Sequence, residues 1–225
     1  MISRRCFVIA GGAFLCVRPS LGQTADKPSL LSTPPGKALG FAVVRKGSKI
    51  GEHLLAFEQN GEGNLVVRVA VQLKVGIGPI TLFRYTHNAT ETWKNGQLVS
   101  LETQTNDDGK PFKVSGHKSS DAGFLVEGTK APLYTAPESA LPATHWNRKM
   151  LDGPMINTQD GRLMHPTITL IGSDAIPVAS GAKITANHFS LTGDAVLDTW
   201  YDDTANWSGL SFKASDGSDV VYERI

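Results

Sequence analysis

Apolar residues occupy every second position from Leu65 to Val75, an arrangement that places them all on one face of a β-strand. Between them, Arg68, Gln72 and Lys74 point to the opposite face, so we expect one face in a core and the other in water. Shorter alternating blocks recur from Leu39 to the end of the chain, separated by turn residues, and no long block has helical spacing. The sequence therefore predicts an all-β fold.

The links between the expected strands are short and rich in glycine. Gly47, Gly61, Gly63 and Gly96 lie in loops of the hairpin type, because glycine adopts the positive φ that such turns need. Strands joined in this way form an antiparallel meander, and we expect about 11 or 12 of them. Such a sheet curls into a half-open or closed barrel with an apolar trough on its concave side, which we favour over a sandwich of two sheets.

One long segment, Ala136–Asn157, departs from this pattern. It contains three prolines, and within it Thr144–Leu151 suits a single helical turn. We expect a long irregular insert. Segments of this kind often lie over a pocket, so the insert is a candidate lid.

Residues 1–22 have the organisation of an export signal. Arg4 and Arg5 precede an apolar run from Cys6 to Val17, and a polar stretch with small residues ends at Gly22. At about 12 residues, the run is shorter than the roughly 20 that a membrane-spanning helix needs. The motif Ser3-Arg4-Arg5-Cys6-Phe7-Val8 resembles the twin-arginine consensus, so we expect export to the periplasm, with this route favoured over general secretion.

Cleavage of this signal peptide would leave a flexible linker, residues 23–38, followed by one β domain, residues 39–225. It would remove both cysteines, Cys6 and Cys16, so the mature protein would have no disulfide and no cysteine-ligated metal. It would also remove three arginines and no acidic residue, which makes a chain of formal charge +1 mildly acidic. We therefore expect no nucleic-acid partner and no integral membrane segment after cleavage.

The motifs of common enzymes are missing from the sequence. It contains no G-x-S-x-G elbow, no H-E-x-x-H, no C-x-x-C and no G-x-x-x-x-G-K loop. His53, His117, His165 and His188 lie on separate expected strands without the spacing of metal ligands, and we expect them at the surface or at a sheet edge. We predict no metal site and no cofactor.

The expected strand Thr81–Trp93 carries the first group of candidate site residues. Tyr85, His87 and Glu91 share its aromatic-rich face. A histidine and a carboxylate on an inward face need hydrogen-bond partners, so the two could hold a polar group of a ligand or act as an acid/base pair. Alternatively, they lie at the mouth of the barrel, in water or bonded to loop backbone.

The insert and the residues after it carry the second group. His145 and Trp146 could close one end of the barrel, while Asn147, Asn157 and Gln159 could supply donors and acceptors to a ligand. In the simpler interpretation, the tryptophan is a hydrophobic plug and the amides satisfy loop backbone.

The expected strand Asp194–Tyr201 carries the third group. Asp198 and Trp200 share one face, and Tyr201 lies on the other, so both faces present a large side chain for ligand contact. Asp198 lies between apolar neighbours and is a candidate catalytic carboxyl group. The simpler interpretation is an exposed acid on the outer face.

Four segments carry a resemblance to a known family: Arg84–Trp93, Leu141–Asn147, Asn157–Gly161 and Leu197–Asp202. They resemble an uncharacterised family of exported proteobacterial proteins, the domain of unknown function six-one-three-four, over nearly all of Leu39–Ile225. That family carries no settled activity. The resemblance implies a curved antiparallel sheet similar to the periplasmic Lol-type lipoprotein carriers, whose concave face holds acyl chains.

These features favour a periplasmic binding or carrier protein that holds an apolar or amphipathic small molecule, such as a lipid, in a β half-barrel under the His145 segment. The alternative is an envelope hydrolase, lyase or isomerase acting on a glycan or lipid-linked substrate. It would use His87 or His145 as base and Glu91 or Asp198 as partner. A structural module would instead show a filled barrel with one broad apolar outer patch.

Overall fold

The computed structural model describes residues 31, 33–77 and 80–225. The expected export signal and most of the expected linker lie outside these residues. Two short 3-10 helices are present, η1 (Pro35–Lys37) and η2 (Arg148–Asp152), and the described residues form no α-helix. In this part of the chain, no helix has the length and apolar character to cross a membrane.

Thirteen strands form one antiparallel sheet. Eight precede the insert: β1 (Ala38–Arg45), β2 (Ser48–Gln59), β3 (Leu65–Ile77), β4 (Ile80–Lys94), β5 (Gln97–Asp107), β6 (Lys110–Ser119), β7 (Gly123–Gly128) and β8 (Ala131–Ala136). Five follow it: β12 (Thr167–Pro177), β13 (Lys183–Thr192), β14 (Leu197–Tyr201), β15 (Trp207–Lys213) and β16 (Asp219–Arg224). The predicted all-β antiparallel meander is confirmed, with slightly more strands than expected.

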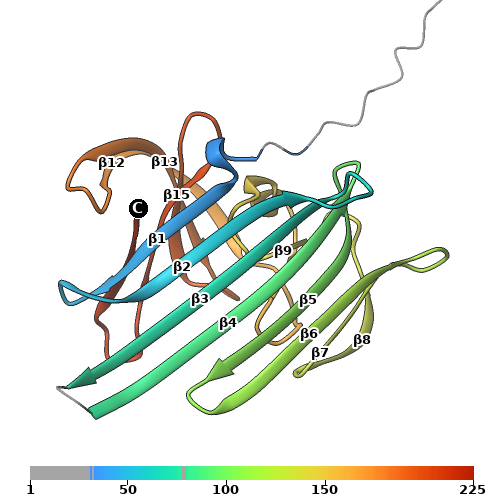
Figure 1. Ribbon diagram of the computed structural model, residues 1–225, viewed down its shortest axis with the longest axis horizontal. Helices are drawn as coiled ribbons and strands as arrows, with labels where there is room; N and C mark the ends of the chain where they lie inside the picture. Colours follow the sequence, from blue (N-terminus) through green and yellow to red (C-terminus); the bar gives the residue numbers. More distant parts are fainter. Residues whose placement is uncertain (1–30, 32, 78–79) are drawn as a thin grey trace, which may run out of the picture.

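The strands follow one another in chain order with one exception, the pairing of β16 with β1. In this pairing Phe41 lies opposite Arg224. Because the last strand is joined to the first, the edges of the sheet are β8 and β12, the two strands that flank the insert. The sheet curves strongly without closing, as Figure 1 shows, so the half-open form of the predicted barrel is the observed one.

The hairpin turns have the backbone that their sequences predict. Asn95 and Gly96 between β4 and β5 have φ angles of 51° and 80°, and Asp108 and Gly109 between β5 and β6 have 51° and 89°. Positive φ at both central residues is the type I′ turn, whose twist matches that of the flanking strands. These turns fix the register that sends alternate side chains of β4 and β5 to the concave face.

The insert lies inside the curved sheet. It contains β9 (Leu141–Pro142), η2, β10 (Met155–Ile156) and β11 (Leu163–Met164), and the three short strands pair with one another. Trp146, Met150 and Met155 are buried in one core with concave-face residues such as Phe57 and Val67. In Figure 1 the insert, in yellow, lies behind β2 to β5. It is therefore a plug that fills much of the expected apolar trough, and the expectation of a lid over a wide hollow is wrong in this respect.

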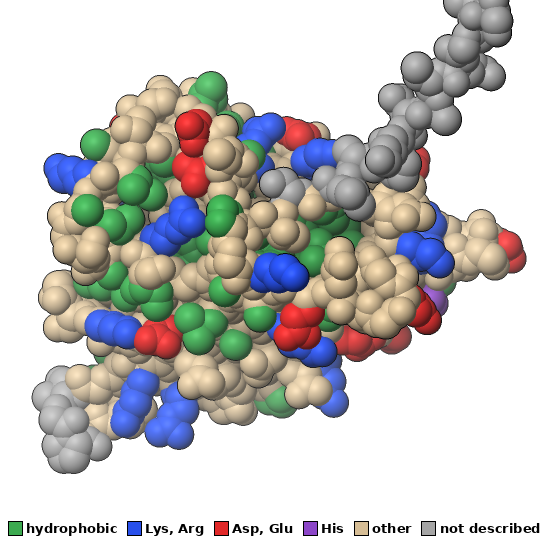
Figure 2. Space-filling model, turned by 45° about the horizontal axis from the view of Figure 1, so that its top comes forward, with side chains coloured by type: hydrophobic (Ala, Val, Ile, Leu, Met, Phe, Trp, Pro, Cys, Tyr) green, Lys and Arg blue, Asp and Glu red, His purple; other side chains and the backbone are tan. Residues whose placement is uncertain are grey.

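Charged side chains are mixed on the surface. On the face drawn in Figure 2, lysine, arginine and acidic groups are interspersed, and neither sign gathers into one large patch. This face therefore offers no extended basic surface of the kind that binds a phosphate backbone.

Candidate functional site

The register of β2, β3 and β4 brings two histidines onto one row of the concave face. His53 lies opposite Val71, and Val71 lies opposite His87. Two strand spacings of about 4.8 Å separate the two histidine backbones by roughly 10 Å. Both side chains are buried, at 6% exposure each.

The insert brings a third histidine to the same place. His145 has a φ of 67°, a conformation that is uncommon outside glycine. Two contacts hold it: its ring stacks on Trp207 with centroids 5.1 Å apart, and its backbone oxygen accepts a 2.8 Å hydrogen bond from the Tyr201 hydroxyl. A strained residue fixed on two sides is often part of a functional site.

The three histidines line a chamber of about 140 Å³. Tyr85 and Tyr222 contribute to its wall, and Val69 and Val71 form part of its apolar surface. We call this space the histidine chamber.

Burial keeps the imidazoles of the histidine chamber uncharged at neutral pH. It lowers the pKa of His87 to about 4 and that of His145 to about 4. Burial also lowers the pKa of His53 well below its usual value, and the neighbouring His145 and His87 lower it further. Each ring is therefore a neutral group with one donor and one acceptor nitrogen.

Two buried ring nitrogens of residues that line the histidine chamber have no hydrogen-bond partner among the described residues. They are Nε2 of His53 and Nδ1 of His145. By contrast, Nδ1 of His87 lies 2.7 Å from the Thr105 hydroxyl. A buried polar atom without a hydrogen bond costs on the order of 1–3 kcal/mol, so these nitrogens suit a polar group of a bound molecule.

A larger cavity of about 500 Å³ adjoins the histidine chamber, because Tyr85 and Tyr222 line both. We call it the mouth cavity. Seven apolar side chains contribute to its wall: Ile50, Leu73, Val75, Phe83, Phe212, Ala214 and Val220.

Polar groups are few in the mouth cavity. They include Arg45, Asp107 and Gln159. The guanidinium of Arg45 is paired with Asp216, at 2.8 Å. The amide oxygen of Gln159 accepts a 3.2 Å hydrogen bond from the Tyr85 hydroxyl, at the boundary of the two spaces.

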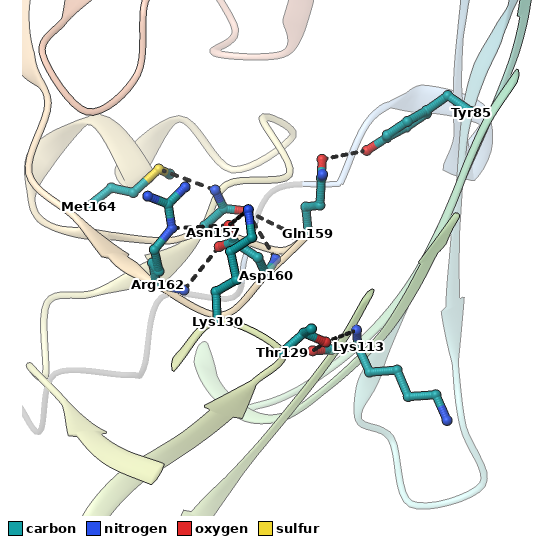
Figure 3. Close-up of polar contacts among 9 residues, drawn as sticks. All are labelled: Tyr85, Lys113, Thr129, Lys130, Asn157, Gln159, Asp160, Arg162 and Met164. Atoms are coloured by element: carbon teal, nitrogen blue, oxygen red, sulfur yellow. Dashed lines mark hydrogen bonds and ion pairs between the residues drawn. The ribbon is translucent and has the colours of Figure 1, made fainter. Parts of the chain in front are cut away.

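The loop that carries Gln159 is fixed to the wall of the sheet. The side-chain oxygen of Asn157 accepts hydrogen bonds from the backbone N–H groups of Gln159 and Asp160, at 2.9 and 3.3 Å. Asp160 is bound by Arg162 at 3.0 Å, and its backbone oxygen accepts from the backbone N–H of Lys130 at 2.9 Å. Figure 3 shows these contacts, with Gln159 directed toward Tyr85.

Glu91 anchors the insert and does not pair with His87. Its buried carboxyl group accepts hydrogen bonds from the indole nitrogens of Trp93 and Trp146, at 2.8 and 2.9 Å, and from the Thr144 hydroxyl at 2.5 Å. Four residues along a strand separate Glu91 from His87, which is roughly 13 Å at ~3.3 Å per residue. Although they share a face, the two side chains lie too far apart to form an acid/base pair.

The other predicted site residues fall into different places. Trp146 lies in the core, against Phe57 and Trp93. The Asn147 oxygen caps η2 by accepting from the backbone N–H of Lys149 at 3.2 Å. The amide of Asn157 caps its own loop, so of the insert candidates only His145 and Gln159 reach the two cavities.

The third predicted group is divided between two faces of β14. Tyr201 is fully buried in the core, whereas Asp198 and Trp200 lie on the opposite face. There His188 contacts Asp174 at 2.8 Å and Asp198 at 3.2 Å, and its ring stacks on Trp200. Asp198 is 40% exposed and lines neither the mouth cavity nor the histidine chamber.

His53 is the site residue that the sequence interpretation missed. It was expected at the surface or at an edge, yet it is buried against Phe41, Trp207 and Tyr222. The sequence did contain a signal for this position. His53 lies two and four residues before Leu55 and Phe57 in β2, so it points to the same face as these two core residues.

The described residues include no group of three or more His, Cys, Asp and Glu side chains placed to hold a metal ion.

Comparisons with known proteins give a family and a fold. The model of a family described as "Domain of unknown function (DUF6134)" matches residues 41–225. No curated protein matches the chain. Among solved structures, the chain is similar to a β-barrel-like protein of the domain of unknown function DUF1849 from Brucella abortus. That similarity has a TM-score of 0.56 at 9% identity and covers 84% of this chain and 95% of that one.

Proposed function

The chain belongs to the family described as Domain of unknown function (DUF6134), and we propose that it is a periplasmic binding or carrier protein for an amphipathic small molecule. The apolar part of that molecule occupies the mouth cavity, and its polar end points toward the histidine chamber. Export by the twin-arginine signal would place the protein in the periplasm.

One observation carries this proposal: an apolar cavity at the end of the sheet adjoins a buried polar one. At about 500 Å³, the mouth cavity has the size of a small-molecule site. Sites of this kind combine an apolar wall with a few fixed polar groups. Here Tyr85 and Gln159 stand at the junction and are already hydrogen-bonded to each other.

The plug changes where a ligand would lie compared with an open trough. Because Trp146 and Met155 fill the centre of the concave face, the remaining space is near the turns that end β3 and β15. A short or medium chain is a better match than a long one lying along the whole sheet.

The alternative, an envelope hydrolase, lyase or isomerase, receives less support from the same geometry. Neutral histidines could serve as bases. However, the described residues that line the histidine chamber include no carboxylate, Glu91 is occupied by three donors, and Asp198 lies on the outer face. A histidine–carboxylate pair is therefore not assembled at the chamber.

Filling the mouth cavity tests the proposal. Leu73→Trp places a larger side chain in this space and is expected to lower the affinity for Nile red, an uncharged apolar probe, by about tenfold or more. Fluorescence titration of the purified protein measures this affinity, and mass spectrometry of an organic extract identifies molecules that copurify.

The matched control is Leu170→Trp, since Leu170 is 61% exposed on β12 and outside the mouth cavity. It should bind the probe as the unmodified protein does. The proposal fails if the extract contains no amphiphile and Nile red does not bind to the unmodified protein. It also fails if Leu73→Trp and Leu170→Trp bind Nile red equally well.

A further inference from the structure

We propose that the histidine chamber selects an uncharged head group that both donates and accepts hydrogen bonds, of the kind that an alcohol carries. This inference rests on the proposed function and specifies the chemical class of the ligand. It concerns the inner end of the site, where the mouth cavity meets the three histidines.

Two ring nitrogens at the chamber have no hydrogen-bond partner in the described part of the chain. Nε2 of His53 comes from β2, and Nδ1 of His145 comes from the insert, and both belong to side chains that line the same 140 Å³ space. A neutral imidazole nitrogen is either a donor or an acceptor, depending on the tautomer. A hydroxyl group has one donor and two acceptor lone pairs, so one hydroxyl can satisfy both rings when at least one of the two nitrogens carries a proton.

The side chains that form the wall of the histidine chamber are uncharged at neutral pH. The titratable side chains that line the chamber are His53 on β2, Tyr85 and His87 on β4, His145 on the insert and Tyr222 on β16, whereas β3 and β15 contribute only apolar side chains. The histidines are neutral because of their burial, and burial raises the pKa of Tyr222 to about 12, so that hydroxyl is neutral too.

The nearest charged side chains of the described residues do not line the histidine chamber. Arg45 and Asp107 line only the mouth cavity, and Glu91 is enclosed by the insert. An ionised head group would therefore lose its hydration without gaining an opposite charge, a cost of several kcal/mol. The chamber thus disfavours carboxylates and ammonium groups alike.

The volume of the histidine chamber limits the size of the head group. A water molecule takes ~30 Å³ of liquid volume, so 140 Å³ holds roughly five groups of that size. A hydroxyl and the first carbons of its chain fit this space, whereas a sugar ring with its hydroxyl groups does not. The rest of the molecule would extend past Tyr85 and Tyr222 into the mouth cavity.

The test compares three ligands that differ only in the head group: decan-1-ol, decanoate and decylammonium. Each competes with Nile red on the unmodified protein at pH 8. Decanol is expected to bind at least about tenfold more tightly than either ion. Decanoate binding should strengthen as the pH falls toward 5, because protonation gives it a neutral head group, whereas decanol binding should change little between pH 6 and 8.

Substitution of His53 tests whether the preference for decanol arises in the histidine chamber. His53→Leu replaces the imidazole with an apolar side chain of similar size and so removes the unpartnered nitrogen, and it should lower the affinity for decanol about tenfold relative to the affinity for Nile red. The control is His117→Leu on β6, which is exposed and should change neither affinity. Because the ligand series uses the unmodified chain, it remains decisive even if His53→Leu folds poorly.

The outcomes separate the two proposals. If Nile red binds but decanoate at pH 8 competes as well as decanol, or if His53→Leu folds and binds decanol normally, the head-group inference fails and the binding function stands. If neither Nile red nor any of the three ligands binds, the binding function fails, and the inference fails with it.

Discussion

Replacing Glu91 with alanine is expected to destabilise the protein by about 4 kcal/mol, because it leaves three buried donors without their acceptor. In this variant, the indole N–H groups of Trp93 and Trp146 and the hydroxyl of Thr144 lose their hydrogen-bond acceptor. The last two of these donors belong to the insert, so this carboxyl group is the main polar tie between the plug and β4. Urea unfolding followed by circular dichroism measures the change in unfolding free energy.

The control for this substitution is Glu102→Ala on β5. Glu102 is exposed, and its single side-chain hydrogen bond among the described residues comes from the Ser115 hydroxyl, so its loss should cost no more than about 0.5 kcal/mol. A cost below about 1 kcal/mol for Glu91→Ala would contradict the anchoring role.

Glu91 should also make stability depend on pH, in a direction that the structure fixes. Burial raises the pKa of its carboxyl group above the usual 4.5, although the hydrogen bonds from Thr144, Trp146 and Trp93 partly oppose this. The folded protein then holds the proton more tightly than the unfolded chain, so the stabilisation is complete below pH 4.5 and is lost as the pH rises through the folded pKa. Glu91→Gln lacks this group, and its stability relative to the unmodified protein should therefore increase from pH 4 to pH 8.

Gly128→Ala is the second substitution with a large expected effect, about 2–3 kcal/mol of lost stability. A Cβ at this position of β7 would lie 2.4 Å from the backbone oxygen of Asp160 and 2.6 Å from the Cα of Gly161. Both are backbone atoms, so no side-chain rotation relieves the clash. The loop that carries Gln159 must move away from the sheet, and its hydrogen bond from Thr103 to the backbone oxygen of Thr158 should break.

The matched control for Gly128→Ala is Gly61→Ala, since nothing lies within 4 Å of a Cβ built on Gly61. Thermal and urea unfolding compare the two variants. Equal stabilities would show that the close approach of the loop to β7 is not required by the fold.

Much of the fold could be predicted because it depends on local patterns. Alternation in Leu65–Val75 and turn pairs such as Asn95-Gly96 determine strands and hairpins within a few residues of one another. The pairing of β16 with β1 joins the two ends of the domain, and no local signal encodes it. That pairing moves the open edges to β8 and β12, which is why the insert enters the sheet from its two edges.

The site was harder to predict because its contacts are distant in the sequence. Glu91 and Trp146 are 55 residues apart, and the Tyr201 hydroxyl reaches His145 from 56 residues away. Strand alternation places His87 on the concave face, and the same reasoning applied to His53 would have found it. The position of His145 beside them follows only from the packing of the insert, which alternation does not describe.

The most direct test of this account observes the histidine rings themselves. Ring nitrogen and carbon signals of isotopically labelled histidine are recorded by NMR before and after addition of decan-1-ol at pH 7. We expect the signals of His53 and His145 to shift while those of the exposed His117 stay in place, with all chamber rings neutral throughout. Saturable binding of decanol that leaves the His53 and His145 signals unchanged would contradict this expectation.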